Sequence, residues 1–339
     1  MQHADATIQL AHGGGGRLSQ QLIHDVLLPA FGPADGVLHD AALLPSPGQT
    51  LAFTTDSYVV RPLFFPGGDI GRMAVIGSVN DLAMAGARPV ALSLGLILEE
   101  GLPMGTLKRV VDSIREAAEQ CGVAVLTGDT KVVERGKGDG VFVNTSAIGV
   151  VEHGLTIHPS SVQPGDAVLV SGDLGRHGTA ILIAREELGF RSTLESDLAP
   201  LHSCVLELIA AGVELHCLRD LTRGGLASGL DEIARGASCT IEVNEEAIPF
   251  DPAVDSACEL LGLDPLAMAN EGRMVVICPA ASAELALRHM RCDHPNACQI
   301  GTVQESREAH SRHPVHLRNR FGVLRPLELG RGEQLPRIC

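Results

Sequence analysis

The sequence predicts a two-domain protein of the α/β (α+β) class, and three observations support this prediction. The chain has 339 residues, more than one hydrophobic core usually serves. Hydrophobic residues make up 45% of it and 38 residues are glycine, a composition typical of a folded globular protein. Short apolar runs of strand length alternate with amphipathic helical segments. We expect the boundary between the two domains near residues 152–160.

The net charge disfavours some classes of function, and the cysteine content indicates the cellular compartment. The net charge of −15 argues against a nucleic-acid-binding surface, so an anionic substrate such as ATP would need metal ions or local donors. The nine cysteines include no CxxC pair, and an odd number without a leader peptide fits a reducing compartment. The longest apolar stretch, residues 89–98, is too short to span a bilayer. We therefore predict a soluble, cytoplasmic protein that binds neither nucleic acid nor membranes.

A glycine run near the N-terminus precedes an amphipathic helix expected at about residues 19–28. The run consists of Gly13, Gly14, Gly15 and Gly16. Glycine backbone can close over an anion with its N–H groups. The run matches neither the P-loop nor the dinucleotide-binding pattern, so a plain flexible linker is the alternative to a phosphate site.

The next two elements place acidic residues among small and apolar ones. A strand expected at residues 51–56 ends in an acidic turn at Asp56. A helix that opens after Asp69 carries Asn80 and Asp81 within a run of small and apolar residues. A carboxylate is costly to bury there unless it is paired or binds a metal. A metal or nucleotide site is one interpretation of this helix, and a solvated turn is the other.

A second acidic residue follows a strand later in the same half. The expected elements are a strand at 90–98, a helix at 106–120 that Gly122 stops, and a buried strand at 123–126. Asp129 and Lys131 then project to the same side if the chain stays extended. Carboxylate oxygens suit Mg²⁺, and a lysine suits phosphate charge or proton transfer. A surface ion pair is the alternative.

The second half continues to alternate strand and helix. Asp220 stands before a helix start that Thr222 is expected to cap, where free N–H groups form an anion site. Glu271 lies on a loop beside a strand expected at 274–278. The other expected elements are a hairpin tip at 135–140, strands at 142–151, 167–170, 239–243 and 297–303, and helices at 178–187, 205–211, 251–261 and 282–291. We expect regular structure to end at Val303.

Acidic residues in surroundings rich in glycine, threonine and asparagine occur in both halves. They are Asp56, Asp69, Asp81, Asp129 and Asp220. Together they predict a site between the domains that binds more than one Mg²⁺ and a polyphosphate.

The chain ends in a thiol, Cys339. The polar run at residues 330–334 cannot bury enough apolar surface to fold alone. About nine extended residues reach roughly 30 Å, so this tail can carry its sulfur between a partner and a cleft of its own protein. An ordinary disordered end with an accidental thiol is the alternative.

Five segments resemble the family of the hydrogenase maturation factor HypE. They are residues 53–57, 77–87, 127–133, 220–225 and 336–339. The first four resemble the wider aminoimidazole-ribonucleotide synthetase-like superfamily, which includes selenophosphate synthetase and thiamine-monophosphate kinase. The Pro-Arg-Ile-Cys ending is what singles out HypE, and the resemblance covers essentially the whole chain.

The resemblance implies a two-domain aminoimidazole-ribonucleotide synthetase-like fold. In that fold, N-terminal strands form a barrel across a homodimer and ATP binds between the domains. The implied segments are a Gly-rich loop and helix at 1–40, an ATP-binding and dimerisation domain at 41–155, a C-terminal α/β domain at 156–329 and a flexible tail at 330–339.

The resemblance also implies an ATP-dependent carbamoyl dehydratase that supplies cyanide ligands for metallocentre assembly. HypF would place a carbamoyl group on Cys339, and ATP would drive its dehydration from a thiocarboxamide to a thiocyanate. The cyanide would pass to iron on the HypC–HypD complex, for [NiFe]-hydrogenase. A small-molecule kinase or a selenophosphate-type synthetase would give the tail no role, and a non-enzymatic scaffold would only present the thiol.

Residue roles follow from motif position in that family. Those implied for Mg²⁺ and phosphate are Asp56, Asp81, Asp129 and Asp220, with Asn80 and Thr130 beside the nucleotide and Gly13, Gly14, Gly15 and Gly16 closing over it. Lys131 and Glu271 would contact the amide of the tail and move protons, with Cys339 as the covalent site.

Overall fold

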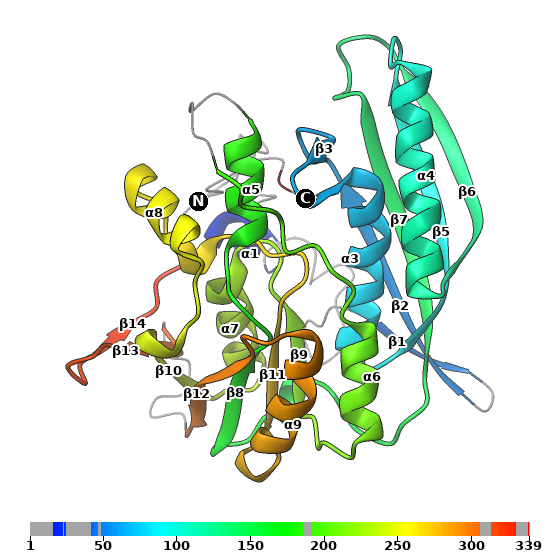
Figure 1. Ribbon diagram of the computed structural model, residues 1–339. Helices are drawn as coiled ribbons and strands as arrows, with labels where there is room; N and C mark the ends of the chain where they lie inside the picture. The colour runs from blue at the N-terminus through cyan, green and yellow to red at the C-terminus, as the bar shows by residue number, and fades with distance from the viewer. Residues whose placement is uncertain are drawn as a thin grey trace, which may run out of the picture.

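Figure 1 shows the computed structural model, which describes residues 16–22, 24, 42–46, 49–185, 192–305, 313–329 and 338. Two sheets, each with its own helices, lie on either side of helix α3 (Ile70–Met84). The predicted residues Gly13, Gly14, Gly15 and Cys339 lie outside the described part of the chain.

The N-terminal sheet has five strands in the order β1-β2-β7-β5-β6. Neighbouring strands run antiparallel except β5 and β6, which are parallel and are connected through helix α4. The bounds are β1 Ala42–Ser46, β2 Gln49–Tyr58, β5 Arg88–Glu99, α4 Met104–Cys121, β6 Ala124–Val133 and β7 Val141–Val151, with a small hairpin of β3 Phe64–Phe65 and β4 Gly68–Asp69.

The second sheet has seven strands in the order β14-β13-β10-β12-β8-β11-β9. Its strands are β8 Asp166–Val170, β9 Cys217–Asp220, β10 Thr240–Asn244, β11 Met274–Pro279, β12 Cys298–Gln304, β13 Val315–Arg318 and β14 Leu324–Pro326. Its helices are α5 Arg176–Ala184, α6 His202–Ala210, α7 Gly225–Gly236, α8 Pro252–Leu261 and α9 Ala280–Asp293, with 3-10 turns at Pro159–Ser161, Glu245–Ala247 and Pro265–Ala267. The short helix α1 (Arg17–Leu22) lies on this side of the molecule.

Helix α3 is buried on nearly all sides because it contacts strands β2, β7 and β9 and helices α4 and α6. Its sequence is small and apolar all round, which is typical of a helix in the centre of a protein. Asp69 caps its N-terminus: the carboxylate accepts hydrogen bonds from the Gly71 and Arg72 N–H groups and from Ser113. Asp69 therefore caps a helix, and it does not belong to the predicted metal and phosphate site with the other acidic residues.

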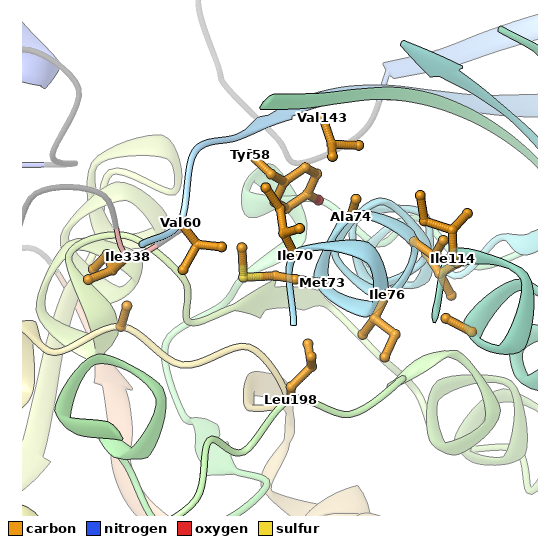
Figure 2. Close-up of a cluster of buried hydrophobic side chains, with 14 of the residues drawn as sticks. Tyr58, Val60, Ile70, Met73, Ala74, Ile76, Ile114, Val143, Leu198 and Ile338 are labelled. Carbon is orange, nitrogen blue, oxygen red and sulfur yellow. The ribbon is translucent and has the colours of Figure 1, made fainter. Parts of the chain in front are cut away.

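One buried cluster joins α3 to both halves of the molecule. Figure 2 shows Ile70, Met73 and Ile76 of α3 together with Leu198 from the second half. The same cluster includes Ile338, the penultimate residue of the chain. The centre of the molecule is therefore an apolar contact between the halves.

Strand β6 differs from the sequence prediction. Residues 123–126 were expected to form a buried strand, but β6 is solvent-exposed from Ala124 to Val132 because it forms the edge of the sheet. It also continues to Val133, so Asp129 and Lys131 lie within the strand rather than after it. Helix α4 agrees with the prediction, and Gly122 ends it in the left-handed conformation, with φ of 62°.

The end of the regular structure was also predicted wrongly. Strands β13 and β14 follow Val303, and β13 pairs in parallel with β10 and antiparallel with β14 at one edge of the second sheet. Six of the cysteines in the described ranges are buried, as their apolar surroundings predicted, and Cys292 is exposed. Within the described residues, no helix combines the length and apolar character that crossing a membrane requires.

Candidate active site

Strand β2 and helix α3 bring two of the predicted carboxylates together. Alternate residues of a strand share one face, and Thr54, Asp56 and Tyr58 face α3 in this way. Thr54 Oγ1 donates a hydrogen bond of 2.6 Å to Asp81 Oδ2. The Tyr58 hydroxyl donates one of 2.9 Å to Asp56 Oδ2. Both carboxylates are thereby oriented by neutral hydroxyl groups.

The second half contributes two more buried carboxylates. Asp220 ends β9, and Glu271 lies on the loop before β11, which pairs with β9. Asp220 is 4% exposed and Glu271 is 3% exposed. Since β9 contacts α3, these side chains lie near enough to Asp56 and Asp81 for their charges to interact, where the two halves face each other.

Burial raises the pKa values of all four carboxyl groups, those of Asp56, Asp81, Asp220 and Glu271, and mutual repulsion raises the last three further. Desolvation raises the pKa of Glu271 well above its usual value, and the charges of Asp220, Asp197 and Asp56 raise it further. The pKa of Asp81 is raised well above its usual value for the same reasons. Burial raises the pKa of Asp220 to about 6. Arg223 opposes the shifts, but the carboxylates outnumber it.

Two carboxylate oxygens in this cluster have no hydrogen-bond partner. Asp220 Oδ1 and Glu271 Oε1 are both buried and accept no hydrogen bond, and Asp220 Oδ1 lies 3.6 Å from a guanidinium nitrogen of Arg219. A buried carboxylate oxygen that accepts no hydrogen bond costs free energy that a cation or a donor group would recover. The cluster is therefore built to receive positive charge.

The hard oxygen donors of this cluster suit Mg²⁺. In the described ranges, no three His, Cys, Asp or Glu side chains converge into a site that holds an ion by themselves. Mg²⁺ is commonly bound by one or two carboxylates together with the phosphates of a nucleotide. The arrangement thus fits a metal ion that enters with its polyphosphate.

Asn80 makes hydrogen bonds across the boundary between the halves. Its amide nitrogen donates to the carbonyls of Ala199 (3.1 Å) and Glu271 (3.2 Å). Its amide oxygen accepts from the Leu201 N–H at 2.8 Å. The structure places this predicted nucleotide-binding residue where it fixes the Glu271 loop to α3.

Asp197, which the sequence analysis did not identify, supports the same loop. Its carboxylate accepts hydrogen bonds from the backbone N–H groups of Glu271 (3.3 Å) and Gly272 (3.2 Å), and from that of His177 (3.1 Å). A side chain at Gly272 would put its Cβ 2.0 Å from the Asp197 carbonyl oxygen, so only glycine fits this close approach. The loop that carries Glu271 is held from both halves.

Asp129, Thr130 and Lys131 do not join the cluster within this chain. The Lys131 ammonium lies 2.9 Å from an Asp129 carboxylate oxygen, and each side chain is 70% exposed. Hydrogen bonds from Lys131 and from the Thr130 N–H lower the pKa of Asp129. Asp129 pairs with Gly95, which pairs with Asn144, and these residues lie on the face of the sheet opposite α3. The sheet therefore separates Asp129 and Lys131 from Asp56.

The end of the chain reaches the contact between the halves. Ile338 is 8% exposed, and its carbonyl oxygen lies 2.6 Å from the Nε2 atom of the buried His177. Sequence analysis identified the tail but missed His177, Tyr58, Asp197 and Arg223. The alternation along β2 could have indicated Thr54 and Tyr58 beside Asp56, whereas no local signal marks His177 or Asp197.

Comparisons with known proteins agree with this geometry. The family models for AIR synthase related proteins match residues 38–151 with their N-terminal domain and residues 163–313 with their C-terminal domain. The chain is 48% identical to the carbamoyl dehydratase HypE of Cupriavidus necator, over 98% of this chain and 95% of that protein.

Solved structures give the same result. The chain is similar to a HypE in a HypE–HypF complex, with a TM-score of 0.85 and 43% identity over 91% of this chain and 99% of the other. It is also similar to the hydrogenase maturation protein HypE in complex with ATP, with a TM-score of 0.81 and 46% identity over 98% of this chain and all of the other. The chain therefore belongs to the carbamoyl dehydratase HypE family, with the two domains of AIR synthase related proteins.

Proposed function

We propose that this protein dehydrates an S-carbamoyl group on its own Cys339 to a thiocyanate, at the expense of ATP, and so supplies cyanide for the iron of [NiFe]-hydrogenase. The observation that carries the proposal is the burial of Ile338 between the two halves, one residue before Cys339. Ile338 contacts His177, and Asp197 links His177 to the Glu271 loop. A substrate attached to the tail would thus enter the carboxylate cluster.

The chemistry requires that a poor leaving group be activated. The oxygen of the carbamoyl group attacks the γ-phosphoryl group of ATP, ADP leaves, and the oxygen becomes part of a good leaving group. Phosphate then departs as the two N–H protons are removed and the C≡N bond forms. The first step depends on positioning and charge neutralisation, and the second on a base in a site that excludes water.

Within this site, Asp56, Asp81 and Asp220 would hold the Mg²⁺ ions that neutralise the phosphates. Glu271 would accept a proton from the nitrogen. Its raised pKa makes Glu271 hold a proton as long as no cation is bound nearby, and the arrival of positive charge would lower that pKa enough for it to act as a base. Gly16, the last residue of the glycine run and the one that the structure describes, is buried, which suits a loop that closes over a nucleotide.

We further propose that the protein works as a homodimer. The face of the N-terminal sheet opposite α3 carries Phe53, Ile97 and Ile148, and the described part of the chain leaves each of them at least 40% exposed. A second copy that closes this face into a barrel would bury those side chains. Asp129, Thr130 and Lys131 lie on the exposed edge strand, so we assign them to the active site across that interface.

HypF would supply the carbamoyl group, and the solved HypE–HypF complex of a relative supports this partner. The HypC–HypD complex would accept the cyanide. Both exchanges require the tail to leave the protein between steps, and residues 330–334 are polar enough to allow it.

Mass spectrometry of the C-terminal peptide tests the proposal. With HypF, carbamoyl phosphate and ATP, we expect the peptide to gain one carbamoyl group and then to lose one water. Replacing the exposed Cys292 with alanine should change neither step, whereas Cys339→Ala should abolish both. Normal ATP turnover after deletion of the last four residues would instead identify a small-molecule kinase and refute the proposal.

A further inference from the structure

Ile338, the penultimate residue of the chain, is bound in a buried position, although the dehydration chemistry involves only Cys339. The Ile338 side chain belongs to the apolar cluster that includes Val60, Phe65 and Leu198. In Figure 2, Ile338 lies at the Val60 end of this cluster. Its carbonyl oxygen faces His177 Nε2 at 2.6 Å. Ile338, the described residue of the tail, is thus held by its apolar side chain and by a backbone hydrogen bond.

The hydrogen bonds of His177 fix its tautomer. A carbonyl oxygen can only accept, so Nε2 must carry the proton that is donated to Ile338. Nδ1 then accepts a hydrogen bond from the Ser196 hydroxyl at 2.8 Å. That hydroxyl is free to donate because its oxygen accepts from the Leu198 N–H at 3.2 Å. Burial lowers the pKa of His177, which keeps the ring neutral and preserves this pattern.

The ring itself cannot follow the tail outward. His177 is fully buried in the first turn of α5. The edge-to-face contact with Phe65, at 5.4 Å between ring centroids, restricts its rotation. Its backbone N–H donates to Asp197, which also binds the Glu271 and Gly272 N–H groups. His177 is therefore a fixed donor whose position relative to the Glu271 loop is set by a shared carboxylate.

We propose that His177 is a positioning residue that holds the protein's own C-terminus, through the Ile338 carbonyl, so that Cys339 is presented to the Glu271 loop. The placement of the tail stands on the contacts above, and only its consequence for dehydration rests on the proposed function. When the tail leaves, the Nε2 proton loses its partner in an apolar environment. That cost favours return of the tail and raises the docked-to-free ratio by about tenfold, the typical effect of one buried hydrogen bond.

Alkylation of Cys339 measures docking without any turnover. N-ethylmaleimide is added to the full-length protein, and peptide mass spectrometry follows Cys339 against the exposed Cys292 as an internal reference. We expect His177→Leu to raise the Cys339-to-Cys292 rate ratio by about tenfold. His177→Gln keeps a donor near the Nε2 position and should restore the wild-type ratio. Ile338→Ser, a change in the tail that leaves the body of the protein intact, should raise the ratio as His177→Leu does.

The same variants separate this proposal from the function it serves. His177→Leu should accept the carbamoyl group from HypF at least as fast as the wild-type protein but dehydrate it about tenfold more slowly in a single turnover. An unchanged alkylation ratio in both His177→Leu and Ile338→Ser, or an equal rise in His177→Gln and His177→Leu, would overturn the positioning role. Normal dehydration despite a raised ratio would overturn it too. If the wild-type protein never dehydrates the carbamoyl group, while His177→Leu still raises the alkylation ratio, the dehydratase is refuted and the tail-binding role stands.

Discussion

His177 and Glu271 are joined through a single carboxylate, because Asp197 accepts a hydrogen bond from the backbone N–H of each. His177 holds the tail and Glu271 is the proposed base, so the group that receives the substrate and the group that acts on it share one support. Asn80 fixes the same loop to α3 from the other half through the Glu271 carbonyl. A small shift of either half would therefore move both groups together.

Asp220 should make the empty protein less stable at neutral pH than in mild acid. Its pKa is about 6 in the folded state and about 3.8 ordinarily, so between these values only the folded state keeps the proton and stability falls as the pH rises. Asp220→Asn removes this effect. We expect the variant to gain up to about 3 kcal/mol of unfolding free energy at pH 7.5, and less at pH 5.

Thermal unfolding at the two pH values, with and without ATP and Mg²⁺, checks this expectation. Nucleotide should raise the Tm of the wild-type protein and have little effect on Asp220→Asn, because ligand binding stabilises only a competent site. A variant with a lower Tm at pH 7.5 and full stabilisation by nucleotide would show that Asp220 is a structural residue.

Gly77 on α3 should be needed to keep Tyr58 on Asp56. A Cβ at residue 77 would lie 2.2 Å from the Tyr58 hydroxyl oxygen, so Gly77→Ala must displace the ring that orients Asp56. We expect a loss of about 1–3 kcal/mol of stability from overpacking and weaker ATP binding. Tyr58→Phe removes only the hydrogen bond and should cost about 1 kcal/mol.

Gly105 provides the matched control, since it lies in α4 and a Cβ there would meet nothing within 4 Å. Gly105→Ala should be neutral or stabilise by up to about 1 kcal/mol, and should leave ATP affinity unchanged. Calorimetric titration with ATP distinguishes the variants. Equal affinities for Gly77→Ala and Gly105→Ala would remove Tyr58 from the site.

Lys131 should act across the dimer interface. Lys131→Ala protein should accept the carbamoyl group but fail to dehydrate it. Mixed with Cys339→Ala protein, which has no tail thiol but an intact Lys131, the Lys131→Ala chains should regain dehydration in heterodimers. Single-turnover measurement on the mixture reports this, because only the Lys131→Ala chain can carry the substrate.

A doubly substituted partner, Lys131→Ala with Cys339→Ala, should give no recovery and serves as the control. If the first mixture stays inactive although exchange of subunits is complete, Lys131 acts within its own chain and β6 must move on binding. Full activity of the Lys131→Ala protein alone would remove this residue from the mechanism.

The sequence by itself determined the family, the two-domain α/β architecture and most elements of regular structure. Local signals were sufficient for these. Gly122 ends α4, a continuous run of small and apolar residues marks α3, and the short motifs around Asp56, Asp81 and Asp220 are contiguous in the chain. The Pro-Arg-Ile-Cys ending indicated the chemistry because its reactive atom is the last side chain of the sequence.

Only the tertiary structure decided which of the acidic residues meet. Asp69 caps a helix, and Asp129 lies on the opposite face of the sheet from Asp56, although all three stand in similar local sequences. The partners that complete the site, His177, Asp197 and Ile338, lie on separate segments of the chain. Their contacts arise from packing between distant segments, which no short-range pattern encodes, because burial free energy depends on what the whole fold brings together.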